Sequence, residues 1–141
     1  MKLSADWIVG FVDGEGCFSY SLIKNDSLRF GYQIQGEFTV VQHERDLELL
    51  HRFKDYFGCG KVARNHDDRY HYRVKNLKEL REVIISFFEE HSLQTVKKHQ
   101  LPVFKEIVLC LTNKEHLEID GFEKVKLLVT KLSELKKMEN S

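Results

Sequence analysis

Residues 7 to 18 read Trp7-Ile8-Val9-Gly10-Phe11-Val12-Asp13-Gly14-Glu15-Gly16-Cys17-Phe18, a segment that combines apolar side chains with three glycines. Its apolar side chains recur at helical spacing, and Ser4 ahead of them can cap a helix. Gly10 and Gly14 share one face of that helix. Because each glycine costs about 1 kcal/mol against alanine, the pair indicates close approach by a second helix. We predict a helix over 4–16 that ends on Gly16 as a left-handed cap, with a strand from Phe18.

The composition predicts one domain with a hydrophobic core, since 42% of the 141 residues are hydrophobic. The formal net charge of +0 and pI of about 7.1 count against nucleic-acid binding, unless acidic helices balance a basic face. The cysteines lie far apart, which argues against a disulfide framework. Because neither a signal peptide nor a bilayer-spanning apolar run is found, we expect a soluble, intracellular protein with no membrane partner. An organellar, bacterial or phage compartment is left open.

Period-two alternation predicts β-hairpins over about 18–41 and 61–75. Helical spacing predicts helices over about 44–56, 77–88, 101–111 and 120–137, with Asn76 and Asp120 as N-caps and a polar loop over 94–99. We therefore expect an α+β fold of order α-β-β-α-β-β-α in a single domain, 1–141. Its four strands would form one curved antiparallel sheet with helices covering one face.

The sheet face away from the core would carry amides, hydroxyls and cations. Amides suit adenine, arginine suits guanine, and a two-stranded ribbon fits the major groove of DNA. Each side chain alone is as well explained by a solvated surface, but the collective pattern indicates a DNA-binding face. Ile23 and Ala63 could contact thymine methyl groups, and Glu37 could accept from cytosine or orient a basic side chain. The polar set is Ser19, Ser21, Asn25, Gln33, Gln35, Thr39, Lys61, Asn65, Arg69, His71, Arg73 and Lys75.

The opening stretch resembles the defining motif of the LAGLIDADG homing endonucleases. Gly10 matches the first glycine of that motif, Asp13 its first aspartate, Gly14 its small residue and Gly16 its last glycine. Glu15 falls on the second acidic position, which binds the catalytic metal in that family and is usually Asp. The resemblance covers about 3–111, and its core fold has the element order predicted above. Only one copy of the motif is found.

A single motif implies a homodimer that packs Trp7, Gly10, Phe11 and Gly14 against a second copy. The two Glu15 carboxylates would then meet on the two-fold axis and, at roughly 5 Å, repel by about 3 kcal/mol at an effective dielectric near 20. Divalent cations relieve that repulsion, and hard oxygen ligands favour Mg²⁺ or Mn²⁺. The resemblance implies the Gly14 carbonyl as a second ligand. It also implies double-strand cleavage of a long, pseudo-palindromic DNA target with short 3′ overhangs.

By the same resemblance, Gln42 and Lys97 take places around the catalytic water. Arg45 takes the place of a basic residue after the strand, although His43 or a register shift could serve, and Lys98 competes with Lys97. Two other classes stay open: an intron RNA maturase or non-cleaving DNA-binding regulator on the same fold, and half of an engineered fused enzyme. The DNA target sequence cannot be read from the chain.

Overall fold

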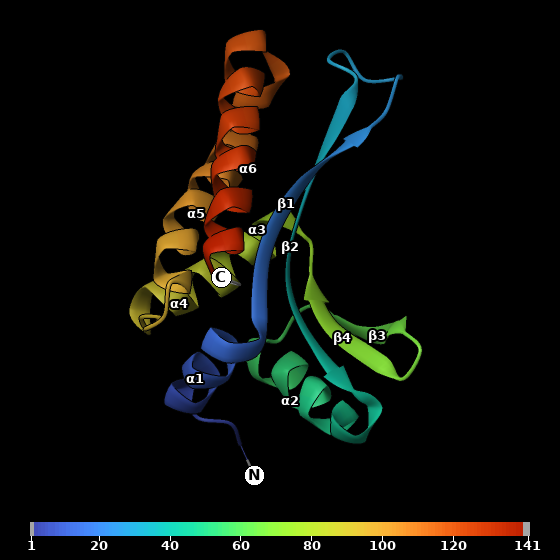
Figure 1. Ribbon diagram of the computed structural model, residues 1–141, viewed down its shortest axis with the longest axis vertical. Coiled ribbons are helices and arrows are strands. Elements are labelled where there is room, and N and C mark those ends of the chain that lie inside the picture. Colours follow the sequence, from blue (N-terminus) through green and yellow to red (C-terminus); the bar gives the residue numbers. More distant parts are fainter. Residues whose placement is uncertain (1, 140–141) are drawn as a thin grey trace.

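A computed structural model describes residues 2–139 of the chain and shows helices packed on a strongly curved sheet (Figure 1). Elements run in the order α1 (Ala5–Glu15), β1 (Gly16–Lys24), β2 (Tyr32–His43), η1 (Glu44–Asp46), α2 (Leu47–Phe57), β3 (Lys61–His66), β4 (Arg69–Val74), α3 (Leu77–Glu79), η2 (Leu80–Ile85), α4 (Ser86–Glu90), α5 (Lys97–Thr112), η3 (Glu115–Leu117) and α6 (Ile119–Glu139). The predicted α+β fold with four antiparallel strands is confirmed.

The sheet has the strand order β1-β2-β4-β3, with every neighbouring pair antiparallel. Strands β1 and β2 pair along their full facing length, from Gly16 opposite Val40 to Lys24 opposite Tyr32. Strand β4 pairs with β2 only as far as Phe38 opposite Val74. The far half of the β1–β2 hairpin therefore projects beyond the other hairpin as a two-stranded ribbon (Figure 1).

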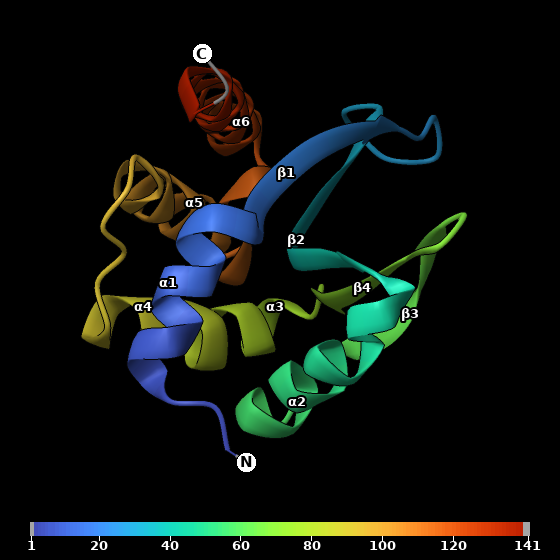
Figure 2. The same cartoon turned by 60° about the horizontal axis from the view of Figure 1, so that its bottom comes forward.

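One sheet face is buried because its even-numbered side chains are large and apolar. Phe18, Phe38 and Tyr72 are fully buried. Phe18 packs on Phe104 of α5 at a ring-centroid distance of 5.3 Å, and Tyr72 stacks on Phe57 of α2 at 6.3 Å. Helices α2 and α5 thus cover the same face from opposite ends (Figure 2). The odd-numbered side chains form the other face, termed the sheet face below.

The junction of α1 and β1 differs from the prediction. Ser4 caps α1 as expected, since its hydroxyl accepts from the Trp7 amide at 3.2 Å. Gly16, however, is extended (φ −83°, ψ 162°), so the left-handed cap was wrong. The strand starts at Gly16 itself, two residues before Phe18, and a Cβ there would lie 2.6 Å from Val12 Cγ1. Glycine is therefore required by close packing at this corner.

Three other boundaries shift. Strand β2 begins at Tyr32, after a turn in which Gly31 has φ 81°. Helix α5 begins at Lys97, inside the segment predicted as a loop. Asp120 lies in the first turn of α6 and not ahead of it. Among residues 2–139, no helix combines the length and hydropathy needed to cross a bilayer.

Candidate active site and nucleic-acid interface

Helix α1 presents an unfilled surface, the glycine face, made by Gly10 and Gly14. Both glycines are exposed, and a Cβ built on either would have no described atom within 4 Å outside its own helix and neighbours. Beside them, Trp7 is 43% exposed and stacks on Phe11 at 5.0 Å, while Phe11 leans on Phe53 of α2 at 5.7 Å. The predicted interface residues therefore gather on one side of α1, where another helix can approach closely.

Next to the glycine face, α1 is tied into the chain through the Asp13 carboxylate. It accepts hydrogen bonds from the Gln94 amide at 2.9 Å, the Thr95 amide at 3.1 Å and the Thr95 hydroxyl at 2.7 Å. These donors lie in the segment between α4 and α5. The carboxylate thus fixes the end of α1 against the start of α5.

Lys97 brings a positive charge to the same place. Its Nζ donates to the Asp13 carbonyl at 3.1 Å and forms an ion pair with the Glu139 carboxylate, and the residue is only 2% exposed. A cation at a helix C-terminus offsets the negative end of the helix dipole. Lys98, the predicted competitor, is exposed. Lys97 is therefore the lysine directed at the end of α1. We name Asp13, Gln94, Thr95, Lys97 and Glu139 the Asp13 cluster.

Gly14 and Glu15 form the exposed end of α1. Carbonyls in the last turn of a helix lack intrahelical partners, so this end offers backbone oxygens beside a carboxylate. Such hard oxygen donors fit Mg²⁺ or Mn²⁺. Among residues 2–139, no three His, Cys, Asp or Glu side chains are grouped to hold a metal ion. A metal bound at Glu15 would need further oxygen ligands from outside the chain.

Strand β2 delivers Gln42 and His43 toward the same end of the sheet, beyond the pairing of Gly16 with Val40. The Gln42 amide donates to its neighbour, the Val41 carbonyl, at 2.8 Å. His43 is used within the chain, since Nε2 lies 2.9 Å from Asp68 and Nδ1 accepts from the Arg45 amide at 3.1 Å.

The Arg45 side chain is 77% exposed and lies 4.0 Å from Asp46. Of the two alternatives predicted for the basic residue after the strand, Arg45 is the one that an external partner can reach. His43 instead ties the end of β2 to the turn between β3 and β4.

Most of the predicted DNA-contacting side chains are accessible on the sheet face. Two are buried, Thr39 at 8% and His71 at 7% exposure, and both lie on strands that have a paired strand on each side. The exposed members are Ser21, Ile23, Gln33, Lys61, Asn65, Arg69 and Lys75; Ser19, Asn25, Gln35 and Arg73 are half-buried.

Some sheet-face groups already have partners inside the chain. Glu37 Oε2 lies 2.6 Å from Arg73 Nε, so Glu37 orients a basic side chain, one of the two roles considered for it. Asn65 lies within 3.3 Å of the His71 ring nitrogen, and burial, with Arg73 next in importance, lowers the pKa of His71. His71 is therefore neutral near pH 7. Asn25 uses its side-chain oxygen in the hairpin turn, where Ser27 donates to it.

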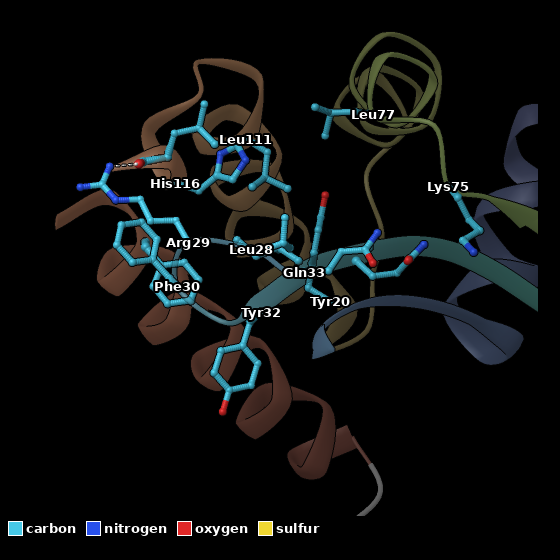
Figure 3. A pocket seen from close by; sticks show the side chains of 15 residues that line it. Tyr20, Leu28, Arg29, Phe30, Tyr32, Gln33, Lys75, Leu77, Leu111 and His116 are labelled. Carbon is cyan, nitrogen blue, oxygen red and sulfur yellow. Dashed lines mark hydrogen bonds between the residues drawn. The ribbon is translucent and has the colours of Figure 1, made fainter. Parts of the chain in front are cut away.

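A separate cavity of about 490 Å³ lies between the projecting ribbon and the α5–η3–α6 corner (Figure 3). The Tyr20 hydroxyl points into the space between Leu111 and Leu77. His116 Nδ1 is buried there with no hydrogen-bond partner among the described residues, and burial lowers the pKa of His116. The cavity is lined by none of Glu15, Gln42, Arg45 and Lys97, so it is distinct from the α1 site.

Sequence reasoning missed three of the contacts above. Thr95 lies in the predicted polar loop, Asp68 lies in a predicted turn, and Glu139 lies two residues beyond the predicted end of the last helix, 120–137, although α6 extends to it. Thr95 carries a signal in hindsight, because a hydroxyl just ahead of a helix commonly satisfies nearby backbone groups. No local pattern marks Glu139 as the partner of a lysine 42 residues earlier.

The comparisons with known proteins agree on one family. The family model for LAGLIDADG endonucleases matches residues 8–108. An uncharacterized 50.9 kDa protein in ND4 intron 1 of Podospora anserina is 36% identical over 113 residues, covering 79% of this chain and 25% of that protein. A probable intron-encoded endonuclease 2 of Neurospora crassa is 30% identical over 125 residues, covering 87% and 28%. This chain thus spans about a quarter of the length of both relatives.

Solved structures extend the likeness. The crystal structure of the homing endonuclease I-TnaI is 38% identical, with a TM-score of 0.88 over 99% of this chain and 98% of that one. I-SmaMI, solved bound to an uncleaved DNA target in the presence of calcium ions, is 31% identical with a TM-score of 0.91. In that case the match covers 94% of this chain and 46% of I-SmaMI.

Proposed function

The chain belongs to the LAGLIDADG endonuclease family, and from that premise we propose that it is a site-specific DNA endonuclease that acts as a homodimer. The observation that carries the proposal is the glycine face beside an exposed acid. Gly10 and Gly14 leave room for a second helix, and Glu15 ends the same helix in solvent. Two copies packed through this face bring their Glu15 carboxylates together at the dimer axis.

In this dimer, Glu15 and the Gly14 carbonyl would hold Mg²⁺ or Mn²⁺ together with phosphate oxygens of the DNA. When bound, the metal would polarise the scissile phosphate and activate water. The chain's own residues set the geometry. The Asp13 carboxylate fixes the end of α1, and the Lys97 ammonium lies at the Asp13 carbonyl, next to Gly14 in the sequence. Gln42 and Arg45, at the end of β2, would orient water and contact the backbone phosphates.

The sheet face would supply target recognition. The β1–β2 ribbon carries mainly uncharged hydrogen-bonding side chains, which suit base edges in the major groove. The β3–β4 hairpin and the residue that follows it carry Lys61, Arg69, Arg73 and Lys75, which suit phosphates and guanine. Because the two chains of a homodimer are related by a two-fold axis, the target would be a long, pseudo-palindromic duplex.

Cleavage selection from a randomised duplex library with Mg²⁺ tests the proposal. We expect a near-palindromic consensus and double-strand breaks. On the selected target, Glu15→Gln should bind with wild-type affinity and lose cleavage. The matched control is Glu44→Gln, an exposed acid in η1 that has no role in the proposed site. Binding without cleavage by the wild type, or RNA binding that DNA does not compete away, would instead favour a regulator or a maturase.

A further inference from the structure

The last turn of α6 is built into the Asp13 cluster. Glu139 pairs through Oε1 with Lys97 Nζ, and its Oε2 accepts from Gln100 Nε2 at 3.3 Å. Both partners lie in the first turn of α5 and are buried, Lys97 at 2% and Gln100 at 1% exposure. Figure 1 shows the C-terminal end of α6 descending toward the level at which α1 passes into β1.

The Glu139 carboxylate offsets the free-energy cost of burying the Lys97 ammonium. An ammonium group withdrawn from water is costly unless it is paired and hydrogen-bonded. The Asp13 carbonyl supplies one neutral acceptor, and Glu139 supplies the opposite charge. Removing one partner of such a pair leaves the other charge buried and uncompensated, which drives the lysine side chain to move.

We propose that Glu139 is a positioning residue for the nuclease reaction, acting through Lys97. It holds the Lys97 ammonium against the Asp13 carbonyl, and so fixes a positive charge at the end of α1 where Glu15 emerges. The inference rests on the proposed function. It makes the last turn of α6, which lies outside the 8–108 family match, a support for the active site.

The first test compares Glu139→Gln with Glu134→Gln, a matched change at an exposed position of the same helix. Single-turnover cleavage and DNA affinity are measured on the selected target. At metal sites, loss of an outer-shell residue that orients a first-shell group typically costs 10- to 100-fold in metal affinity or activity, which sets the scale expected here. We expect Glu139→Gln to cleave about tenfold more slowly with affinity within about twofold of wild type, and Glu134→Gln to match wild type. A faster Glu139→Gln variant would overturn the inference, because the carboxylate would then be blocking Lys97.

A double-mutant cycle separates positioning from simple stabilisation. In a Lys97→Met background, Glu139→Gln should cause no further loss of cleavage rate. A merely structural carboxylate would instead lower the melting temperature and leave the rate of the folded protein unchanged when Lys97 is present. Glu139→Asp keeps the charge and should recover part of the rate, whereas equal losses in the Asp and Gln variants would contradict the proposal.

Lysine labelling gives a readout that does not depend on nuclease activity. Reductive methylation followed by peptide mass spectrometry should find Lys97 protected in wild type and Glu134→Gln, and modified in Glu139→Gln. Exposed Lys98 is the internal standard for labelling. Equal protection in all three proteins would refute the positioning role even if the wild type cleaves DNA. A wild type that cleaves no DNA, yet shows the expected labelling, would count against the proposed nuclease and leave the contact intact.

Discussion

Two adjacent surfaces of α1 differ in whether their groups find partners inside the chain. On the side of the Asp13 cluster, donors and acceptors from three helices and a loop are matched within the chain. On the glycine face, a Cβ added at Gly10 or Gly14 would have no described atom within 4 Å outside its chain neighbours and the backbone of its own helix. Two glycines destabilise a helix through their conformational freedom, and here no contact inside the chain accounts for them. Their position therefore indicates close approach by a helix of another molecule. The Asp13 cluster is therefore complete within one protomer, whereas the glycine face needs a second molecule to cover it.

The sheet face repeats the contrast on a smaller scale. Arg73 and His71 have partners inside the chain, whereas Lys61 and Lys75 are exposed. Exposed acids such as Glu48, Asp55 and Glu90 lie on helices, so a net charge of +0 is compatible with a cationic sheet face. A net charge near zero therefore does not argue against nucleic-acid binding when acidic and basic side chains lie on different surfaces of the protein.

The largest expected effect comes from filling the glycine face. Gly10→Leu adds a good helix former where a Cβ has free space, so the protomer should be as stable as wild type or about 1 kcal/mol more stable. The added side chain blocks helix–helix approach, and misplacement of reacting groups can cost about 100-fold in rate. We expect a monomer by sedimentation equilibrium and at least about 100-fold slower cleavage. Glu134→Leu, at an exposed site on α6, is the control for added apolar surface. A dimeric, fully active Gly10→Leu variant would contradict the assignment of the glycine face to a partner helix.

The next effect concerns the Asp13 cluster and falls on stability. Asp13→Asn leaves one acceptor oxygen where the carboxylate uses two, and hydrogen bonds to a charged group contribute about 1.5–3 kcal/mol each. We expect the free energy of unfolding in urea to fall by about 2 kcal/mol with an unchanged m-value. The control, Asp6→Asn in the first turn of α1, should cost about 0.5 kcal/mol through the helix dipole. Equal losses at both positions would mean that the cluster contributes no more than an exposed helix end.

A smaller effect is expected for the exposed cations of the sheet face. Lys75→Gln should reduce the slope of log K against log salt concentration by about one and weaken DNA binding roughly threefold at 200 mM salt. Its melting temperature should not change, because the side chain is exposed. Lys131→Gln, on the exposed side of α6, is the matched control. If the slope of log K against log salt concentration did not change, Lys75 would not be a residue that contacts DNA phosphates.

Features set by local periodicity were predictable from sequence. The motif helix, both hairpins and the helix stripes follow from spacing, and the resemblance assigned Glu15, Gln42 and Lys97 to one site. The cap at Gly16 was wrong because a glycine that ends a helix and a glycine that permits a tight corner look alike in sequence. Strand β2 was placed two residues early because Phe30 fits a strand face, yet packs on Phe122 of α6 at 5.0 Å.

Contacts between distant segments were not predictable. The pairing of His43 with Asp68 depends on the register of β2 against β4. The burial of His71 depends on the pairing of β4 with a strand on each side, and the pairing of Lys97 with Glu139 depends on how α6 packs on α5. Each of these residues is polar and was therefore placed on a surface, because periodicity gives the face of an element and not what covers it.

The smallest expected effect tests whether His71 is one of the sheet-face residues that an external partner can reach. Burial first, then Arg73, lowers the pKa of His71, and His116 shifts in the same direction by burial. Between the folded pKa and the unfolded value of about 6.5, the unfolded chain binds more protons, so stability should fall as pH falls through that window. One such site can contribute at most about 1.4 kcal/mol per pH unit. His71→Asn should flatten the decline in urea-derived stability between pH 7.5 and 5.5, whereas His51→Asn, at an exposed site on α2, should not. If the His71 variant kept the full wild-type decline, His71 would be protonated as readily as a surface side chain. His71 would then belong with the sheet-face groups that are available to an external partner.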